Sequence, residues 1–182
     1  MNKNIIYLAG GCFWGVEGYF QKIDGVVDTE VGYANGKTDK TNYHAVKLTD
    51  HAETLKVTYD SDIISLEDLL VHYFRLINPT SINKQGNDRG RQYRTGIYSE
   101  DDTTRNRIQL SLDKLQERYD EPIAIENEVV NNYVKAEDYH QDYLLKNPLG
   151  YCHVNLKRAE DPLSDDELAL KADPEDIEKL YR

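Results

Sequence analysis

The segment Gly10-Gly11-Cys12-Phe13-Trp14-Gly15 organises the rest of the sequence. The apolar run Ile5 to Ala9 before it predicts a buried strand, and the spacing of residues 16–20 after it predicts a helix. Cys12 is therefore expected at a turn from strand to helix. Backbone N–H groups and the helix dipole favour an anion at such a turn. We expect them to lower the pKa of Cys12, which makes it a candidate nucleophile at neutral pH.

The residues beside Cys12 indicate what surrounds the sulfur. Phe13 and Trp14 place two large rings next to the thiol, and the flanking glycines cannot cover it. Such rings would form an apolar wall around whatever the sulfur attacks. The alternative is structural, because a lone cysteine is also a small residue that packs well at the buried end of a strand.

Composition narrows the class of protein. The chain has 182 residues, which is enough for one well-buried core, and its net charge of −11 argues against nucleic acid as a partner. No stretch approaches the length of a membrane span, and Ile5 to Ala9 is too short for a secretory signal, so we expect a cytoplasmic protein. We also expect a monomer. The only cysteines are Cys12 and Cys152, and in a reducing compartment such a pair is more often catalytic than structural. No Cys-His cluster has zinc spacing, and we expect no metal.

The pattern along the chain predicts an α+β fold, in which helices cover a mixed, antiparallel-rich sheet. After the first strand and helix, strands are expected at residues 26–33, 54–59, 95–98 and 123–126, and helices at residues 65–77 and 101–119, with a short helix beginning at Ala136. Residues 80–94 are polar and predict a long loop. Glu53 is expected at a strand edge.

The last 26 residues differ in composition from the rest. From Lys157 to Arg182 the sequence is acidic and has few apolar residues to bury. We therefore divide the chain into a catalytic domain, residues 1–156, and an acidic C-terminal tail, residues 157–182, that packs weakly on it.

Several blocks resemble one known family. Gly11 to Gly15 looks like the signature of the A-type peptide methionine sulfoxide reductases (MsrA). Further blocks follow in the order of that family, namely Gly32-Tyr33-Ala34-Asn35-Gly36, Asn42-Tyr43-His44-Ala45-Val46, His51-Ala52-Glu53, residues 85–90, Gln92-Tyr93-Arg94 and residues 136–140. The resemblance covers Ile5 to Leu156. It departs from the family at Asp50, where glycine is usual, and at His44-Ala45, where acidic residues are usual.

The resemblance implies a ferredoxin-like core and a thiol-dependent enzyme that reduces methionine S-sulfoxide, free or in proteins, as a repair of oxidative damage. Phe13 and Trp14 would hold the methyl group of the substrate. Tyr43, Tyr93 and a protonated Glu53 would hold the oxygen, with Glu53 as general acid. Asp88 would be a positioning acceptor.

The resemblance also implies how the enzyme is recycled. Cys12 would become a sulfenic acid, Cys152 would resolve it as a disulfide, and thioredoxin would reduce that disulfide. No bound cofactor is implied.

Two other functions use the same residues. A non-enzymatic redox sensor would need the Cys12–Cys152 disulfide but would leave Phe13, Trp14 and Glu53 without a role. A Cys-His protease could draw on His44, His51, His140 or His153, but none of these lies in a protease signature.

Overall fold

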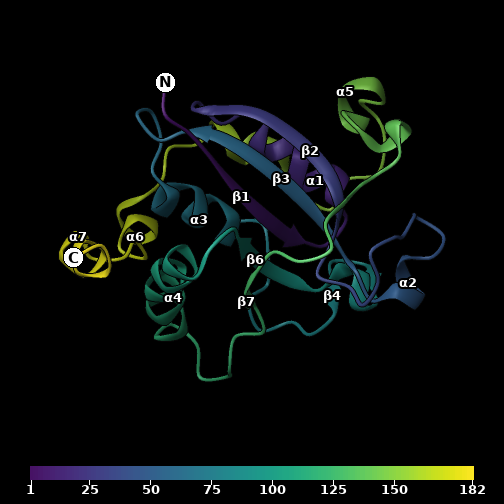
Figure 1. Ribbon diagram of the computed structural model, residues 1–182. Coiled ribbons are helices and arrows are strands. Elements are labelled where there is room, and N and C mark those ends of the chain that lie inside the picture. The colour runs from purple at the N-terminus through teal and green to yellow at the C-terminus, as the bar shows by residue number, and fades with distance from the viewer.

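A six-stranded mixed sheet forms the centre of the protein, whose computed structural model describes residues 1–182 (Figure 1). The strands lie in the order β7-β6-β1-β3-β2-β8. Their bounds are β1 (Lys3–Gly10), β2 (Val26–Ala34), β3 (Ala52–Asp60), β6 (Thr95–Ser99), β7 (Glu126–Val129) and β8 (Val134–Lys135). Neighbouring strands are antiparallel except β6 and β7, which are parallel. The predicted α+β class, with a mixed and antiparallel-rich sheet, is confirmed.

Strand β1 is buried because it has a neighbour on each side. Leu8 lies opposite Leu55 of β3 and opposite Ile97 of β6, and all three side chains are fully buried. Both faces are covered as well, because Ile6 and Leu8 join the main core while Tyr7 and Ala9 join a cluster on the opposite face, so its apolar residues are continuous rather than alternating. The end of β1, which leads to Cys12, is thereby fixed at the centre of the sheet.

Three helices cover the main face of the sheet. They are α1 (Phe13–Phe20), α3 (Leu66–Phe74) and α4 (Asp102–Gln116), and their apolar side chains join those of the sheet in one core of 28 buried residues. Ser65 and Asp101 accept hydrogen bonds from backbone N–H groups in the first turns of α3 and α4, as N-cap residues do. The Tyr73 hydroxyl donates to the Ala9 carbonyl over 2.6 Å, so α3 is tied to the end of β1.

The opposite face of the sheet has a smaller cluster. Tyr7, Ala9, Ala34, Ala52 and Tyr98 form it, and Val130 and Tyr133 from the segment before β8 pack against it.

Three predicted elements differ from the structure. The strand expected at residues 123–126 is wrong, because the paired residues are Glu126–Val129, while Ile125 packs into the core without strand pairing. Residues 80–94 are not a plain loop, since they contain the hairpin β4 (Lys84–Gln85) and β5 (Asp88–Arg89) and the 3₁₀ turn η1 (Arg91–Tyr93). The short helix after Ala136 is divided.

That helix is divided by one backbone conformation. It forms η2 (Asp138–His140) and α5 (Tyr143–Lys146), and between them Asp142 adopts φ of 54°, which a right-handed helix excludes. A further short helix, α2 (Val46–Thr49), precedes β3. No helix has both the length and the apolar character needed to cross a membrane.

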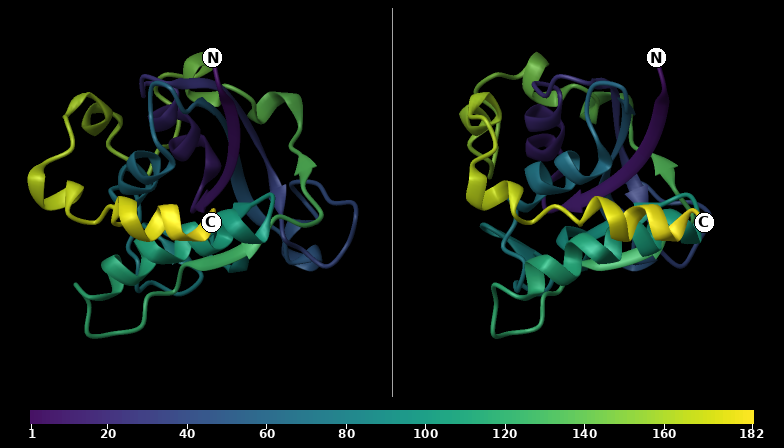
Figure 2. Two further views of the ribbon diagram at one scale, coloured as in Figure 1. Left: turned by 60° about the vertical axis from the view of Figure 1, so that its left-hand side comes forward. Right: turned by 90° about the vertical axis from the view of Figure 1, so that its left-hand side faces the viewer.

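The C-terminal segment packs more closely than its composition suggests. It contains η3 (Leu156–Glu160), α6 (Asp165–Leu168) and α7 (Pro174–Leu180), and Figure 2 shows α7 running across α4. Leu170 and Ala172 are buried, and Leu170 belongs to the main core. The Arg75 guanidinium donates to the Glu167 carboxylate. The expectation that this segment packs weakly is therefore wrong at these residues, whereas the division at residue 156 stays a prediction.

The burial of Leu170 gives a stability prediction. Leu170→Ala should lower the free energy of unfolding by about 2 to 5 kcal/mol, because it removes buried methyl groups and leaves a cavity. Urea unfolding followed by circular dichroism measures the change. Leu168→Ala is the matched control, because Leu168 lies two residues away and is 37% exposed. Equal and small losses in both variants would contradict the packing of this segment on the core.

Candidate active site

The end of β1, the start of α1, the start of β3 and the turn η1 meet around one cavity of about 150 Å³. Eight side chains line it, from Cys12, Phe13, Trp14, Tyr43, Glu53, Asp88, Tyr93 and Tyr151. Every residue predicted for the site except Cys152 is among them. Tyr151 was not predicted, although it immediately precedes Cys152.

Cys12 is the N-cap residue of α1, and its backbone is extended at φ −57° and ψ 121°. The residue before it must be glycine for two reasons. Gly11 has φ of +87°, and a Cβ atom there would lie 2.8 Å from the Cβ of Gln85. The chain can therefore turn directly from β1 into α1, with the Cys12 side chain facing the cavity.

The surroundings of Cys12 favour the thiol form. Burial is the largest contribution that raises its pKa, and the nearby carboxyl of Glu53 adds to it. The backbone N–H of Trp14 acts in the opposite direction but does not compensate. The expectation that the helix start lowers the pKa of Cys12 is therefore wrong, because desolvation outweighs the N–H groups.

Glu53 is the most deeply buried acid of the site. It lies at the start of β3, as the sequence predicted, and β3 is a central strand between β1 and β2. Its side chain is 2% exposed, and its Oε1 atom accepts a hydrogen bond of 3.2 Å from the Phe13 N–H. Burial raises the pKa of Glu53 to about 8, helped by Asp88 and opposed by the Phe13 N–H. At pH 7 Glu53 is mainly a neutral carboxylic acid that can donate a proton.

Trp14 is held in place by two residues that were not predicted for the site. Its indole N–H donates to Nδ1 of His140 over 3.0 Å, and its ring stacks on Tyr143 at a centroid distance of 3.7 Å. Because an indole N–H can only donate, Nδ1 of His140 carries no proton. Burial also lowers the pKa of His140, which keeps the ring neutral. The sequence offered His140 as a histidine within a family block and as a candidate for a Cys-His protease, but not as a partner of Trp14.

Two tyrosine hydroxyls complete the polar side of the cavity. Burial raises the pKa of Tyr43 and of Tyr93, so both remain protonated hydrogen-bond donors at neutral pH. Asp88 lies on β5, where its Oδ2 atom accepts a hydrogen bond of 2.9 Å from Tyr151. The cavity thus joins an acid and two hydroxyl donors to an aromatic wall.

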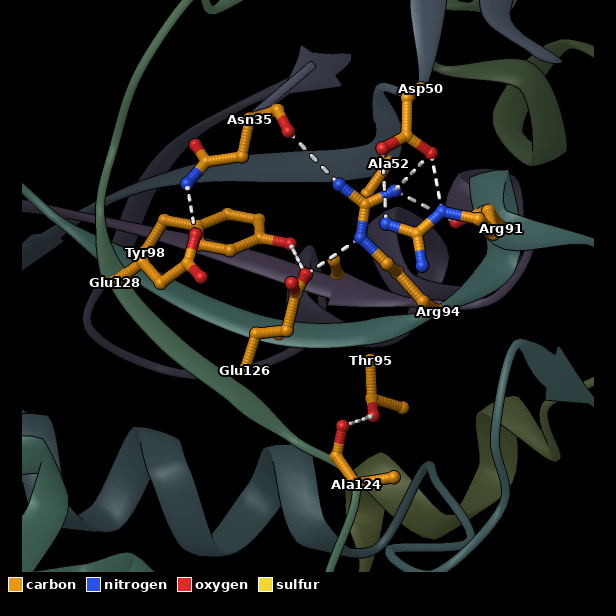
Figure 3. A network of polar contacts seen from close by, with 12 residues as sticks. Asn35, Asp50, Ala52, Arg91, Arg94, Thr95, Tyr98, Ala124, Glu126 and Glu128 are labelled. Carbon is orange, nitrogen blue, oxygen red and sulfur yellow. Dashed lines mark hydrogen bonds and ion pairs between the residues drawn. The ribbon is translucent and has the colours of Figure 1, made fainter. Parts of the chain in front are cut away.

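A network around Arg94 fixes the segment that carries Tyr93 (Figure 3). The buried Arg94 guanidinium donates to Glu126 over 2.7 Å and to the Arg91 carbonyl over 3.0 Å. Asp50 accepts a hydrogen bond of 3.0 Å from Arg91. Asp50 has φ of 62°, a conformation that favours glycine, and its ion pair with Arg91 gives an aspartate a stabilising role there.

Cys152 lies just outside the cavity. Its thiol donates to the Val154 carbonyl over 3.0 Å, and both cysteines are free thiols. A Cβ atom on Gly15 would lie 3.1 Å from Cys152 Sγ, so the segment that carries Cys152 rests on the first turn of α1. The imidazole of His153 hydrogen bonds to the Gly10 carbonyl over 3.0 Å, which fixes the same segment to the end of β1.

No group of three or more histidine, cysteine, aspartate or glutamate side chains is arranged to hold a metal ion. The reactive groups that the site offers are two thiols, a neutral carboxylic acid and tyrosine hydroxyls. This combination defines a thiol-based oxidoreductase site, in which one sulfur reacts beside a proton donor.

The chain belongs to the peptide methionine sulfoxide reductase family, whose model matches residues 4–171. It is similar to reduced Mxr1 from Saccharomyces cerevisiae, with 38% identity over 85% of this chain and 92% of that chain and a TM-score of 0.79. Methionine sulfoxide reductase A of Corynebacterium diphtheriae is 36% identical, over 83% of this chain and 78% of that one, with a TM-score of 0.74. Mxr1 in complex with Trx2 also matches, with 28% identity and a TM-score of 0.57 over 78% and 85% of the two chains. The chain is thus an oxidoreductase of the MsrA type.

Proposed function

We propose that Cys12 reduces methionine S-sulfoxide to methionine, with Glu53 as the general acid. The observation that carries this proposal is the neutral carboxyl of Glu53 in the same cavity as the Cys12 thiol. A sulfoxide oxygen must gain a proton as its bond to sulfur breaks. Glu53 holds that proton at neutral pH because its own site is desolvated.

The reduction of the sulfoxide needs no reagent other than the Cys12 thiol and the Glu53 carboxyl. Sγ of Cys12 attacks the sulfoxide while the Glu53 carboxyl donates its proton to the oxygen, and the thiol proton of Cys12 returns to Glu53. The S–O bond of the substrate breaks and an S–O bond to Cys12 forms. The products are methionine and a sulfenic acid on Cys12, so the substrate sulfur gains the two electrons that Cys12 loses.

The walls of the cavity differ enough to orient the substrate. The methyl group lies against Phe13 and Trp14, and the oxygen accepts hydrogen bonds from Tyr43 and Tyr93. Asp88 positions this polar side through its contact with Tyr151. The methyl group, the oxygen and the attacking Cys12 thiol each occupy a different side of the cavity. The site therefore accepts only one epimer at the sulfoxide sulfur. The family resemblance assigns the S epimer.

Cys152 is proposed to resolve the sulfenic acid. The Cys152 thiol gives up its proton as its sulfur attacks Sγ of Cys12, the S–O bond of the sulfenic acid breaks, a disulfide forms, and the OH group leaves with that proton as water. Support comes from the packing of Cys152 on Gly15, three residues from Cys12. Its thiol is only half-buried and held by one hydrogen bond, to Val154, so a small movement of this segment frees it. A thioredoxin dithiol then reduces the disulfide, as the complex of Mxr1 with Trx2 suggests.

We also infer a ferredoxin-like core. The order β1-α1-β2-β3-α3-β6 along the chain, with the strand order β6-β1-β3-β2 across the sheet, supports it. Residues 1–156 would form the catalytic domain around that core.

Turnover of racemic methyl p-tolyl sulfoxide with a dithiol tests the reductase proposal. One enantiomer should be consumed and the other should remain, and chiral chromatography measures both. Cys12→Ser should abolish this consumption, because a hydroxyl is a far weaker nucleophile than a thiol. Absence of turnover in the wild type would favour the redox sensor, in which the acid and the aromatic wall have no role.

Cys152→Ser tests the assignment of the resolving thiol. This variant should release one methionine per enzyme at the wild-type rate but should lose turnover supported by thioredoxin, because no disulfide forms. Mass spectrometry of the wild type after one turnover should show a linked peptide of Cys12 and Cys152. Undiminished thioredoxin-coupled turnover in Cys152→Ser would overturn the role of Cys152 and leave that of Cys12 intact.

A further inference from the structure

A second, larger groove opens from the active-site cavity. Its volume is about 410 Å³, and it shares four lining residues with the cavity, namely Tyr43, Glu53, Asp88 and Tyr93. Its outer walls come from α2 and from the β4–β5 hairpin, which lie on the same side of the molecule (Figure 1). A substrate with its oxidised side chain in the cavity would therefore pass its flanking residues through this groove.

The outer walls carry free positive charge. Lys47 on α2 and Arg89 on β5 line the groove, and both are exposed. Neither forms an ion pair, whereas nearby Arg91 is neutralised by Asp50. His44 adds a further hydrogen-bonding side chain to the same wall. Lys47 and Arg89 thus place two unpaired cations beside the active site.

The acids of the groove do not cancel these cations. Burial raises the pKa of Glu53 to about 8, so Glu53 is mostly neutral at pH 7. Asp88 is the other acid in the lining, and its Oδ2 atom is already engaged by the Tyr151 hydroxyl. Two positive charges therefore face one negative charge, and the groove is positive where a substrate would enter.

We propose that this groove binds the polypeptide on either side of the oxidised methionine and selects substrates with acidic residues there. The inference rests on the proposed function, because it adds a preference among peptide substrates to the same site. Lys47 and Arg89 would pair with aspartate or glutamate side chains of the substrate. Such pairs are exposed and screened by salt, so they set a preference among substrates rather than a requirement.

Three peptides of equal length test the proposal, each with a central methionine S-sulfoxide flanked on both sides by glutamate, glutamine or lysine. At low salt, kcat/KM should be about tenfold higher for the glutamate peptide than for the glutamine peptide, which is the combined effect of two exposed ion pairs. The lysine peptide should be the poorest substrate. The preference for glutamate should shrink at 0.5 M salt, because salt screens exposed charges.

Lys47→Gln combined with Arg89→Gln should bring the ratio of glutamate to glutamine peptide close to one. The matched control, Lys3→Gln with Arg182→Gln, removes the same number of charges at the opposite end of β1 and should keep the wild-type ratio. Equal kcat/KM for the glutamate and glutamine peptides in the wild type, with normal turnover of methyl p-tolyl sulfoxide, would overturn the groove proposal alone. Failure to reduce any sulfoxide would instead overturn the proposed function on which it rests.

Discussion

The hydrogen bond from the Phe13 N–H to the Glu53 carboxyl is the contact on which the site depends. It joins the first turn of α1 to the start of β3, so the residue after the reactive cysteine and the buried acid are fixed together. The Glu53 side chain is only 2% exposed, although it borders the cavity. Desolvation then raises the pKa of Glu53 to about 8 and also raises the pKa of Cys12. The resting site therefore holds two neutral groups, a thiol and a carboxylic acid.

Close backbone packing keeps this pair in place. Gly11 allows the turn from β1 into α1, and Gly15 leaves room for the segment that carries Cys152. A larger residue at either position would push away Gln85 or Cys152. The glycines of the motif are thus needed less for flexibility than for the approach of two other segments. The same packing places the candidate resolving thiol beside the helix that begins at the nucleophile.

Local patterns in the sequence predicted those parts of the fold that depend on local chemistry. The strand before Cys12, the position of Cys12 at the start of a helix, and the capped helices α3 and α4 follow from apolar spacing and capping residues. The residues that line the cavity followed from family blocks, because nothing local marks Tyr43, Tyr93 or Glu53 among similar side chains. The structure brings them together, and their roles stay predictions.

The features that the sequence did not reveal are set by tertiary contacts. The central position of β3, which carries Glu53, depends on which strands pair with it, and burial of Cys12 reversed the expected direction of its pKa shift. His140 could be recognised as a partner of Trp14 only once two segments far apart in the chain were placed side by side. Leu170 is one of a few apolar residues in an acidic segment, and its burial depends on contact with the main core.

The most direct test of the account is the pH dependence of the first reductive step, measured by rapid quench of methionine release in wild type and in Glu53→Gln. A general acid is active while it is protonated, so the wild-type rate should be level at neutral pH and fall as pH rises through about 8. Glu53→Gln should be about 10² to 10⁴ times slower and should lack this inflection. A Glu53→Gln variant within a few-fold of wild type, with the same pH profile, would contradict the central role of the buried acid.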